Sequence, residues 1–188
     1  MKKKVLLVGI VVIVLLGGFL FFNNKNTSTV KEDKKILVAY FSYTGNTKAM
    51  AKEISKETGG DLFEIKTDKK YDDLTNEVKD EIENDERHTL VSKVDHIEDY
   101  DVVFVGYPIW WHSTPVQINT FLEAYDLSDK TVIPFCTSGG SDLSETLPSF
   151  KNSCKAKKIL EGLTLNGSEA TSKSGQKEIK NWLNKLDY

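Results

Sequence analysis

Five short apolar runs alternate with segments of helical periodicity between residues 36 and 188. The runs are mostly continuous, which is typical of parallel strands that are covered on both faces. The intervening segments place apolar residues three and four positions apart, as in helices that bury one side. The pattern therefore predicts a three-layer α/β sandwich around one parallel sheet. The predicted strands span residues 36–41, 62–65, 102–106, 132–136 and 159–163.

Residues that begin or end helices lie between these strands. Gly59 follows a helical pattern that starts at Thr47, and glycine is common just after a last helical turn. Pro115 suits the first position of the next helix. The Asp-x-x-Glu sequence that begins at Asp142 resembles a capping box and predicts a third helix. An apolar stripe predicts the last helix over residues 175–186.

The segment 67–100 is long and charged for a connection between two strands. Apolar residues spaced four apart from Leu74 to Ile82 predict one helix within it. His88 and His96 lie in the same segment without a fixed carboxylate partner, so we interpret both as surface residues. The sequence predicts no metal site.

The amino terminus is a separate apolar segment. Residues 5–22 carry no charge, and a helix of that length would span about 27 Å, close to the hydrocarbon thickness of a bilayer. We favour a retained single-pass anchor in the cell membrane, with a cleaved signal peptide as the alternative. Residues 1–22 then form the anchor, residues 23–35 a polar linker, and residues 36–188 the folded domain.

Charge around the apolar segment bears on its orientation. Three lysines precede it, which places the amino terminus in the cytoplasm and predicts an extracytoplasmic domain. Lysines also follow the segment, so the reverse orientation stays open. The net charge is −3, but residues 36–188 hold 18 basic and 26 acidic residues, a balance of −8. We expect no nucleic-acid partner for such a surface.

Three loops follow predicted strands at the edge where parallel sheets bind ligands. Residues 42–47 read Ser-Tyr-Thr-Gly-Asn-Thr, and we call them the phosphate loop. Residues 107–115 read Tyr-Pro-Ile-Trp-Trp-His-Ser-Thr-Pro, the tryptophan loop. Residues 137–141 read Thr-Ser-Gly-Gly-Ser, the glycine loop. We expect the three loops to converge.

The phosphate loop has the properties of an anion site. The first amides of a helix lack partners within the helix, and the helix dipole favours negative charge there. Gly45 lets the backbone approach closely, and the hydroxyls of Ser42, Thr44 and Thr47 add donors. The loop contains no lysine, unlike a Walker loop, so we expect one terminal phosphate rather than a triphosphate. A turn that only caps the helix is the alternative.

The other two loops suit a flat ring. The tryptophan loop offers an aromatic surface, and the glycine loop offers small side chains with accessible amides. With a phosphate at the first loop, flavin mononucleotide (FMN) fits best. We expect one of Trp110 and Trp111 beside the ring and the other in the wall. We interpret His112 as a surface residue, with a contact to substrate as the alternative.

With these motifs the chain resembles the flavodoxin family from about residue 35 to residue 188. The resemblance implies a five-stranded doubly wound parallel sheet of order 2-1-3-4-5 that binds FMN. It also implies that the phosphate loop holds the FMN phosphate and that the other two loops flank the isoalloxazine. The implied cofactor-binding residues are Ser42, Thr44, Gly45, Asn46, Thr47, Pro108, Ile109, Trp110, Trp111, Thr137, Ser138, Gly139 and Gly140.

The glycine loop departs from the pattern of electron-carrying flavodoxins, which commonly have an aromatic residue there. Small residues would leave one flavin face open to a nicotinamide or a quinone, as in flavodoxin-like reductases. The leading hypothesis is an FMN-dependent oxidoreductase of the NAD(P)H/quinone type, which moves electrons at the membrane from a reduced donor to a small acceptor. The alternatives are an electron shuttle that docks redox partner proteins and a non-redox module with a vacated flavin site. No catalytic side chain is predicted.

Overall fold

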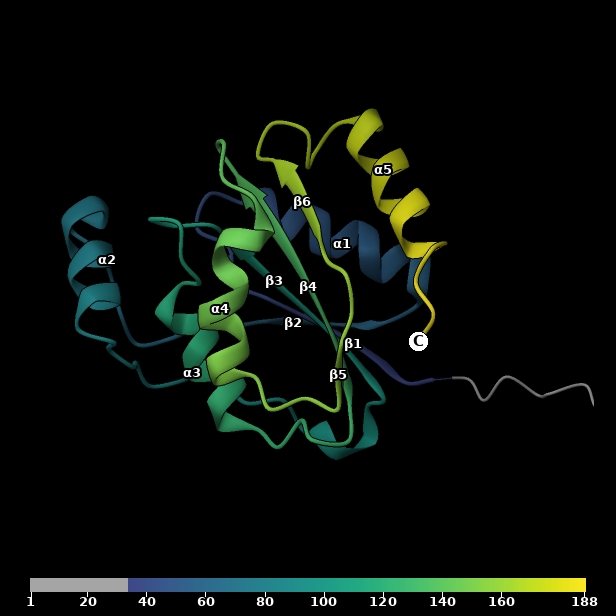
Figure 1. Cartoon of the computed structure of the whole chain (residues 1–188), viewed down its shortest axis with the longest axis horizontal. Helices are drawn as coiled ribbons and strands as arrows, with labels where there is room; N and C mark the ends of the chain where they lie inside the picture. The colour runs from purple at the N-terminus through teal and green to yellow at the C-terminus, as the bar shows by residue number, and fades with distance from the viewer. Residues whose placement is uncertain (1–33) are drawn as a thin grey trace, which may run out of the picture. The chain divides into compact units, whose positions relative to one another are not determined.

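The computed structural model describes residues 34–188 (Figure 1). A parallel sheet has the order β2-β1-β3-β4-β5, with β6 also paired to β4. This order confirms the doubly wound sheet that the resemblance implies. The strands are β1 (Ile36–Tyr40), β2 (Asp61–Glu64), β3 (Val102–Pro108), β4 (Thr131–Ser138), β5 (Lys158–Ile159) and β6 (Leu163–Asn166).

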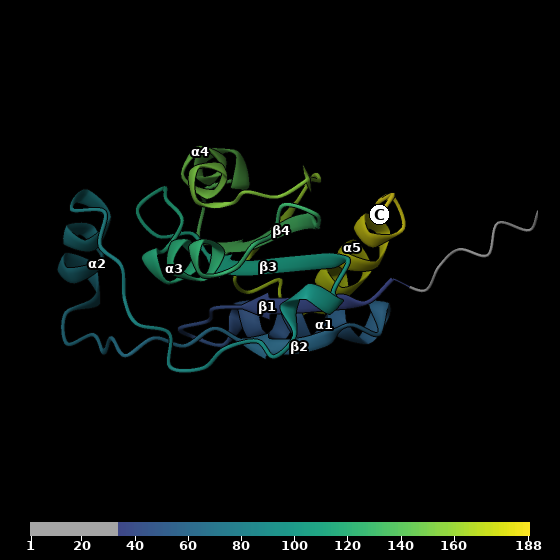
Figure 2. The same ribbon diagram turned by 90° about the horizontal axis from the view of Figure 1, so that it is seen from below.

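Helices cover both faces of the sheet, as Figure 2 shows. One face of the sheet carries the first and the fifth helix of the chain. The other face carries the third and the fourth helix, which lie along β3 and β4. The helices are α1 (Asn46–Thr58), α2 (Leu74–Glu83), α3 (Val116–Ala124), α4 (Leu143–Ser153) and α5 (Lys173–Leu183). Of these, α2 stands apart from both layers in the two views.

Alternate residues of β1 contribute side chains to two separate cores. Leu37 and Ala39 belong to the core beneath α3 and α4, whereas Val38 and Tyr40 belong to the core beneath α1 and α5. Successive side chains of a strand point to opposite faces, so a continuous apolar run feeds both layers. The three-layer prediction is therefore confirmed.

The last predicted strand, residues 159–163, is wrong as a single element. β5 ends at Ile159 and β6 begins at Leu163, and each pairs with β4. Gly162 lies in the gap, where an added Cβ would be 2.3 Å from the carbonyl oxygen of Pro134. The chain approaches β4 too closely there for a side chain, and the edge consists of two short strands.

Most of the helix starts predicted from capping residues and apolar spacing lie within two residues of the starts in the structure. α4 has the predicted capping box, in which Asp142 accepts from the Ser144 amide at 2.9 Å and Glu145 accepts from the Asp142 amide at 2.8 Å. α2 confirms the helix predicted within residues 67–100.

The anchor predicted at residues 5–22 lies outside the described residues and stays a prediction. Across residues 34–188, no helix has the length and apolar character needed to cross a bilayer.

Candidate functional site

The phosphate loop presents backbone donors that lack acceptors. Gly45 has a φ of 96°, in the left-handed region that favours glycine, and precedes α1 directly. The Ser42 hydroxyl accepts from the amides of Gly45 and Lys48, each at 3.2 Å. Within the described part of the chain, four neighbouring amides have no protein acceptor: those of Tyr43, Thr44, Asn46 and Thr47. These donors remain available to an anion at the helix start.

A buried contact joins the phosphate loop to the glycine loop. The hydroxyls of Thr47 and Thr137 are 2.8 Å apart, and both side chains are buried. The sequence predicted the Thr47 hydroxyl as an additional phosphate donor, whereas the structure engages it with Thr137. The contact depends on the pairing of β1 and β4 through β3, which no local pattern indicates.

The Ser138 side chain orders the glycine loop, and no atom packs beside the two glycines of the loop. The Ser138 hydroxyl accepts from the amides of Gly140 at 3.0 Å and Ser141 at 2.6 Å. A Cβ added at Gly139 or Gly140 would meet no atom within 4 Å. The loop is therefore ordered by one buried side chain while its outer side faces open space.

The tryptophan loop contains a tight turn that separates its two indoles. Trp110 and Ser113 exchange backbone hydrogen bonds of 3.4 and 2.8 Å. Between them, Trp111 and His112 have φ values of 47° and 58°, which non-glycine residues seldom adopt. The Trp111 side chain is 51% exposed and donates from Nε1 to the Thr75 carbonyl of α2 at 3.2 Å. The two tryptophans consequently face different neighbours.

A cavity of about 260 Å³ opens where the loops meet. It is lined by Thr44, Asn46, Pro108, Ile109, Trp110, Thr137, Ser138, Gly139, Asn166 and Gly167. Eight of these were predicted, and Trp110 rather than Trp111 is the tryptophan in the cavity wall. The other five predicted residues belong to the same three loops but do not line the cavity: Ser42, Gly45, Thr47, Trp111 and Gly140.

Sequence reasoning missed Asn166, the last residue of β6, and Gly167, which follows it. An added Cβ at Gly167 would be 2.7 Å from Asn46 Nδ2, so this turn closes directly on the phosphate loop. The Asn-Gly pair is a turn signal that could have been read. The predicted strand at residues 159–163 ended too early to place it at the carboxyl edge of the sheet.

His112 bridges the tryptophan loop and the start of α4. Its Nδ1 contacts the Glu145 carboxylate and lies 3.1 Å from the Ser141 hydroxyl. The Asp142 amide, and then His112, hold the pKa of Glu145 below its usual value. His112 is exposed, as interpreted from the sequence, and ties the two flanking loops together.

The segment 67–100 corrects one sequence interpretation. His96 is exposed as expected, but the His88 side chain is only 11% exposed. His88 Nε2 lies 3.1 Å from an oxygen of Glu81, and Glu86 offers a further carboxylate nearby. Lys69 Nζ also lies 3.5 Å from Glu81, so a cation from the protein already occupies this neighbourhood. His88 was misjudged because its partner lies on α2, whose placement the sequence did not indicate.

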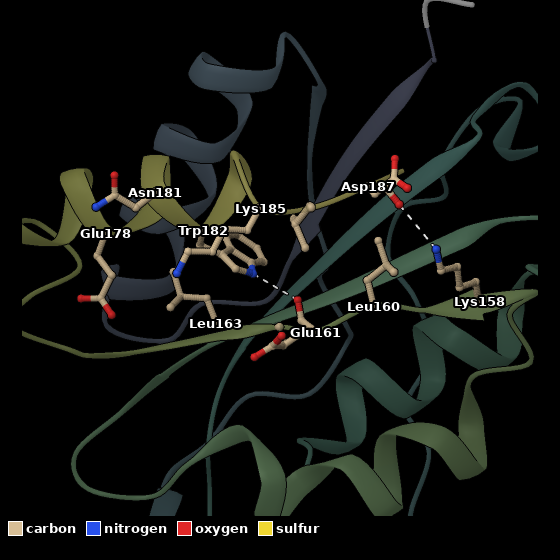
Figure 3. Close-up of a pocket in the computed structure, with 11 residues that line it drawn as sticks. Lys158, Leu160, Glu161, Leu163, Glu178, Asn181, Trp182, Lys185 and Asp187 are labelled. Atoms are coloured by element: carbon tan, nitrogen blue, oxygen red, sulfur yellow. Dashed lines mark hydrogen bonds between the residues drawn. The ribbon is translucent and has the colours of Figure 1, made fainter. Parts of the chain in front are cut away.

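A larger cavity of about 580 Å³ lies elsewhere, between the β5–β6 edge and α5 (Figure 3). In this cavity, the indole nitrogen Nε1 of Trp182 already donates a hydrogen bond to the Glu161 carbonyl at 3.1 Å. None of the three loops lines it. The smaller cavity is therefore the candidate site, because acceptor-free amides and an aromatic wall coincide there.

Comparison with known proteins agrees with the fold. A family model for flavodoxin matches residues 35–186. A candidate flavoprotein of Bacteroides eggerthii DSM 20697 is 36% identical, with a TM-score of 0.69 over 80% of this chain and 96% of that chain. A candidate flavoprotein of Bacteroides uniformis ATCC 8492 is also 36% identical, with a TM-score of 0.66 over 81% and 99%.

A more distant structure shares the fold. The flavoprotein of Lactobacillus acidophilus NCFM, solved in complex with FMN, is 24% identical with a TM-score of 0.59, over 72% of this chain and 95% of that chain. No curated protein gave a match. From the family match, the two relatives at 36% identity and the sheet order, the chain belongs to the flavodoxin family.

Proposed function

We propose that the chain binds FMN and moves electrons between a reduced donor and a small acceptor such as a quinone. One observation carries the proposal: acceptor-free amides at the start of α1 adjoin a cavity that is lined by Trp110 and by the glycine loop. Membership of the flavodoxin family supports it, as does the FMN found in the Lactobacillus acidophilus flavoprotein.

The residues have separate tasks in this proposal. The amides of Thr44, Asn46 and Thr47 would hold the phosphate, since helix-start amides bind anions without a cationic side chain. Ile109 and Trp110 would cover the ring and exclude water from it. Bound FMN would supply the one- and two-electron chemistry, and the protein would supply position and electrostatics.

The bare outer side of the glycine loop favours an enzyme over a pure shuttle. A second molecule needs access to the ring, and no side chain of this loop occupies the space beside Gly139 and Gly140. An electron shuttle that docks redox proteins remains the second candidate. Steady-state oxidation of NADH or NADPH with menadione as acceptor would separate the two, because a shuttle alone gives negligible turnover.

We also propose that residues 5–22 hold the protein at the membrane with the domain outside the cytoplasm. The uncharged stretch and the preceding lysines support this. In the cell, such a domain would lack ready access to cytoplasmic NAD(P)H and would draw electrons from a membrane or protein donor, whereas the purified protein can be assayed with NADH or NADPH as an added donor. Alkaline extraction of membranes, followed by protease treatment of intact cells, tests the anchor and its orientation. Release by alkali would contradict the anchor.

The direct test of cofactor binding is the visible absorption spectrum of the purified full chain in detergent, with and without added FMN. Bound flavin retained through gel filtration at one equivalent supports the proposal. A colourless protein that fails to retain added FMN would instead support a non-redox module. Riboflavin serves as the control that lacks the phosphate.

A further inference from the structure

Tyr71 is fixed at its hydroxyl by two helices. It comes from the segment before α2, donates to Glu81 Oε2 of α2 at 2.7 Å, and accepts from Gln117 Nε2 of α3. Glu81 is 3% exposed and Gln117 is 1% exposed. Two buried partners from different elements leave the phenol little freedom.

The buried carboxylate at the centre of this contact has a cationic side chain within ion-pair distance, although its Oε1 accepts no hydrogen bond. Lys69 Nζ lies 3.5 Å and His88 Nε2 lies 3.1 Å from its other oxygen, Oε1 of Glu81. A buried carboxylate is tolerated only with such partners. Burial, and then the Glu81 carboxylate, raise the pKa of Tyr71, so the hydroxyl keeps its proton and remains the donor.

The ring of Tyr71 meets the aromatic wall of the cofactor cavity. Its centroid lies 5.9 Å from that of Trp110 at an interplanar angle of 88°, and 6.2 Å from that of Tyr43 at 81°. Both are edge-to-face arrangements, which aromatic pairs favour. Trp110 also lines the cavity between the loops. Tyr71 therefore packs against a residue of the cavity wall without lining the cavity itself.

We propose that Tyr71 is a positioning residue for the cofactor site: clamped between Glu81 and Gln117, it sets the position of the Trp110 indole in the cavity wall. This inference rests on the proposed FMN site. It makes the segment 67–100 part of the redox site, although α2 stands apart from the layers that carry the three loops.

The variant Tyr71→Phe tests the clamp in the full chain in detergent. It keeps the ring but leaves Glu81 and Gln117 without their shared partner, so the ring loses its fixed orientation. We expect the FMN dissociation constant to rise roughly tenfold, since an aromatic pair and its orientation contribute on that scale. Bound-flavin fluorescence should also rise, because the quenching indole is no longer held. Unchanged affinity and fluorescence would overturn the proposal.

Tyr125→Phe is the matched control. The Tyr125 hydroxyl accepts from the Val94 amide at 2.8 Å, so it joins the same segment 67–100 to the end of α3 without approaching Trp110. Both variants should lower thermal stability, but only Tyr71→Phe should change FMN affinity. Equal effects of the two variants on affinity would mean that the segment acts only through stability.

A double-mutant cycle tests whether Tyr71 acts through Trp110. In a Trp110→Phe background, Tyr71→Phe should change the FMN dissociation constant less than threefold, because the indole that it positions is gone. The same tenfold effect in both backgrounds would contradict the assignment. Should Tyr71→Phe fail to fold, Gln117→Met removes the same contact from α3 and is read in the same cycle.

A measurement without FMN separates this inference from the proposed function. With Trp111 and Trp182 replaced by Phe, Trp110 is the one tryptophan that remains in the sequence. Tyr71→Phe should then increase acrylamide quenching of Trp110 in the apoprotein at least twofold. That result with no FMN binding would sink the proposed function and retain the clamp, whereas unchanged quenching would sink the clamp.

Discussion

The two side walls of the candidate FMN cavity are built in opposite ways. Trp110 is packed edge to face by Phe41, Tyr43 and Tyr71. In the glycine loop, which also lines the cavity, Gly139 presents no side chain, and an added Cβ would meet no atom within 4 Å. The aromatic wall offers contact area at low conformational cost, and the bare wall offers space. We infer that one wall retains the cofactor and the other gives access to it.

The largest effect should come from removing the aromatic wall. Trp110→Ala should raise the FMN dissociation constant roughly 30- to 150-fold, the loss of about 2 to 3 kcal/mol that an anchoring aromatic residue commonly supplies. Isothermal titration calorimetry measures it. Trp111→Ala is the comparison, because Trp111 contacts α2 and does not line the cavity. Equal losses in both variants would contradict the assignment of Trp110 to the wall.

Filling the bare wall should affect turnover rather than retention. Gly139→Phe should lower kcat/KM for menadione at least about tenfold, or 1.4 kcal/mol, while FMN affinity stays equal or increases. Gly139→Ala should leave both quantities nearly unchanged, because a methyl group there meets open space. Full menadione turnover in the Phe variant would show that the acceptor does not approach from this side.

The smallest effect concerns the His112 contact that joins the two walls at α4. Glu145 has a lowered pKa, so its contribution to stability is complete above its ordinary value of 4.5 and is lost as pH falls through the lowered value. The free energies of unfolding in urea of the wild type and Glu145→Gln should therefore differ at pH 7, and the difference should shrink as pH falls below 4.5 and vanish below the lowered pKa of Glu145. A difference that stays constant with pH would show that the Glu145 charge is not involved.

The loops of this site could be predicted where one local motif decides the geometry. The capping box at Asp142 was predicted and depends on neighbours within a few residues, whereas the sequence assigned Gly45 a close backbone approach but not its left-handed φ. The Thr47–Thr137 contact and the break at Gly162 depend on strand pairing. They could not be predicted from local patterns.

The choice of the tryptophan in the aromatic wall could not be predicted from local patterns either. The sequence indicated that one tryptophan would face the ring but could not choose it, because the choice follows from the left-handed turn at Trp111 and His112. Tyr71 was missed altogether. Its role depends on where α2 places Glu81 relative to α3, over a separation in sequence that carries no periodic signal.

The most direct test compares the affinities of the wild-type protein for FMN and riboflavin, which differ only in the phosphate. Hydrogen bonds from the free amides after β1 to a charged phosphate should make FMN bind roughly 10- to 100-fold more tightly. Gly45→Val, which forces a branched side chain into a left-handed backbone, should reduce that ratio towards one. Equal affinity of the wild type for the two flavins would contradict phosphate binding at the start of α1.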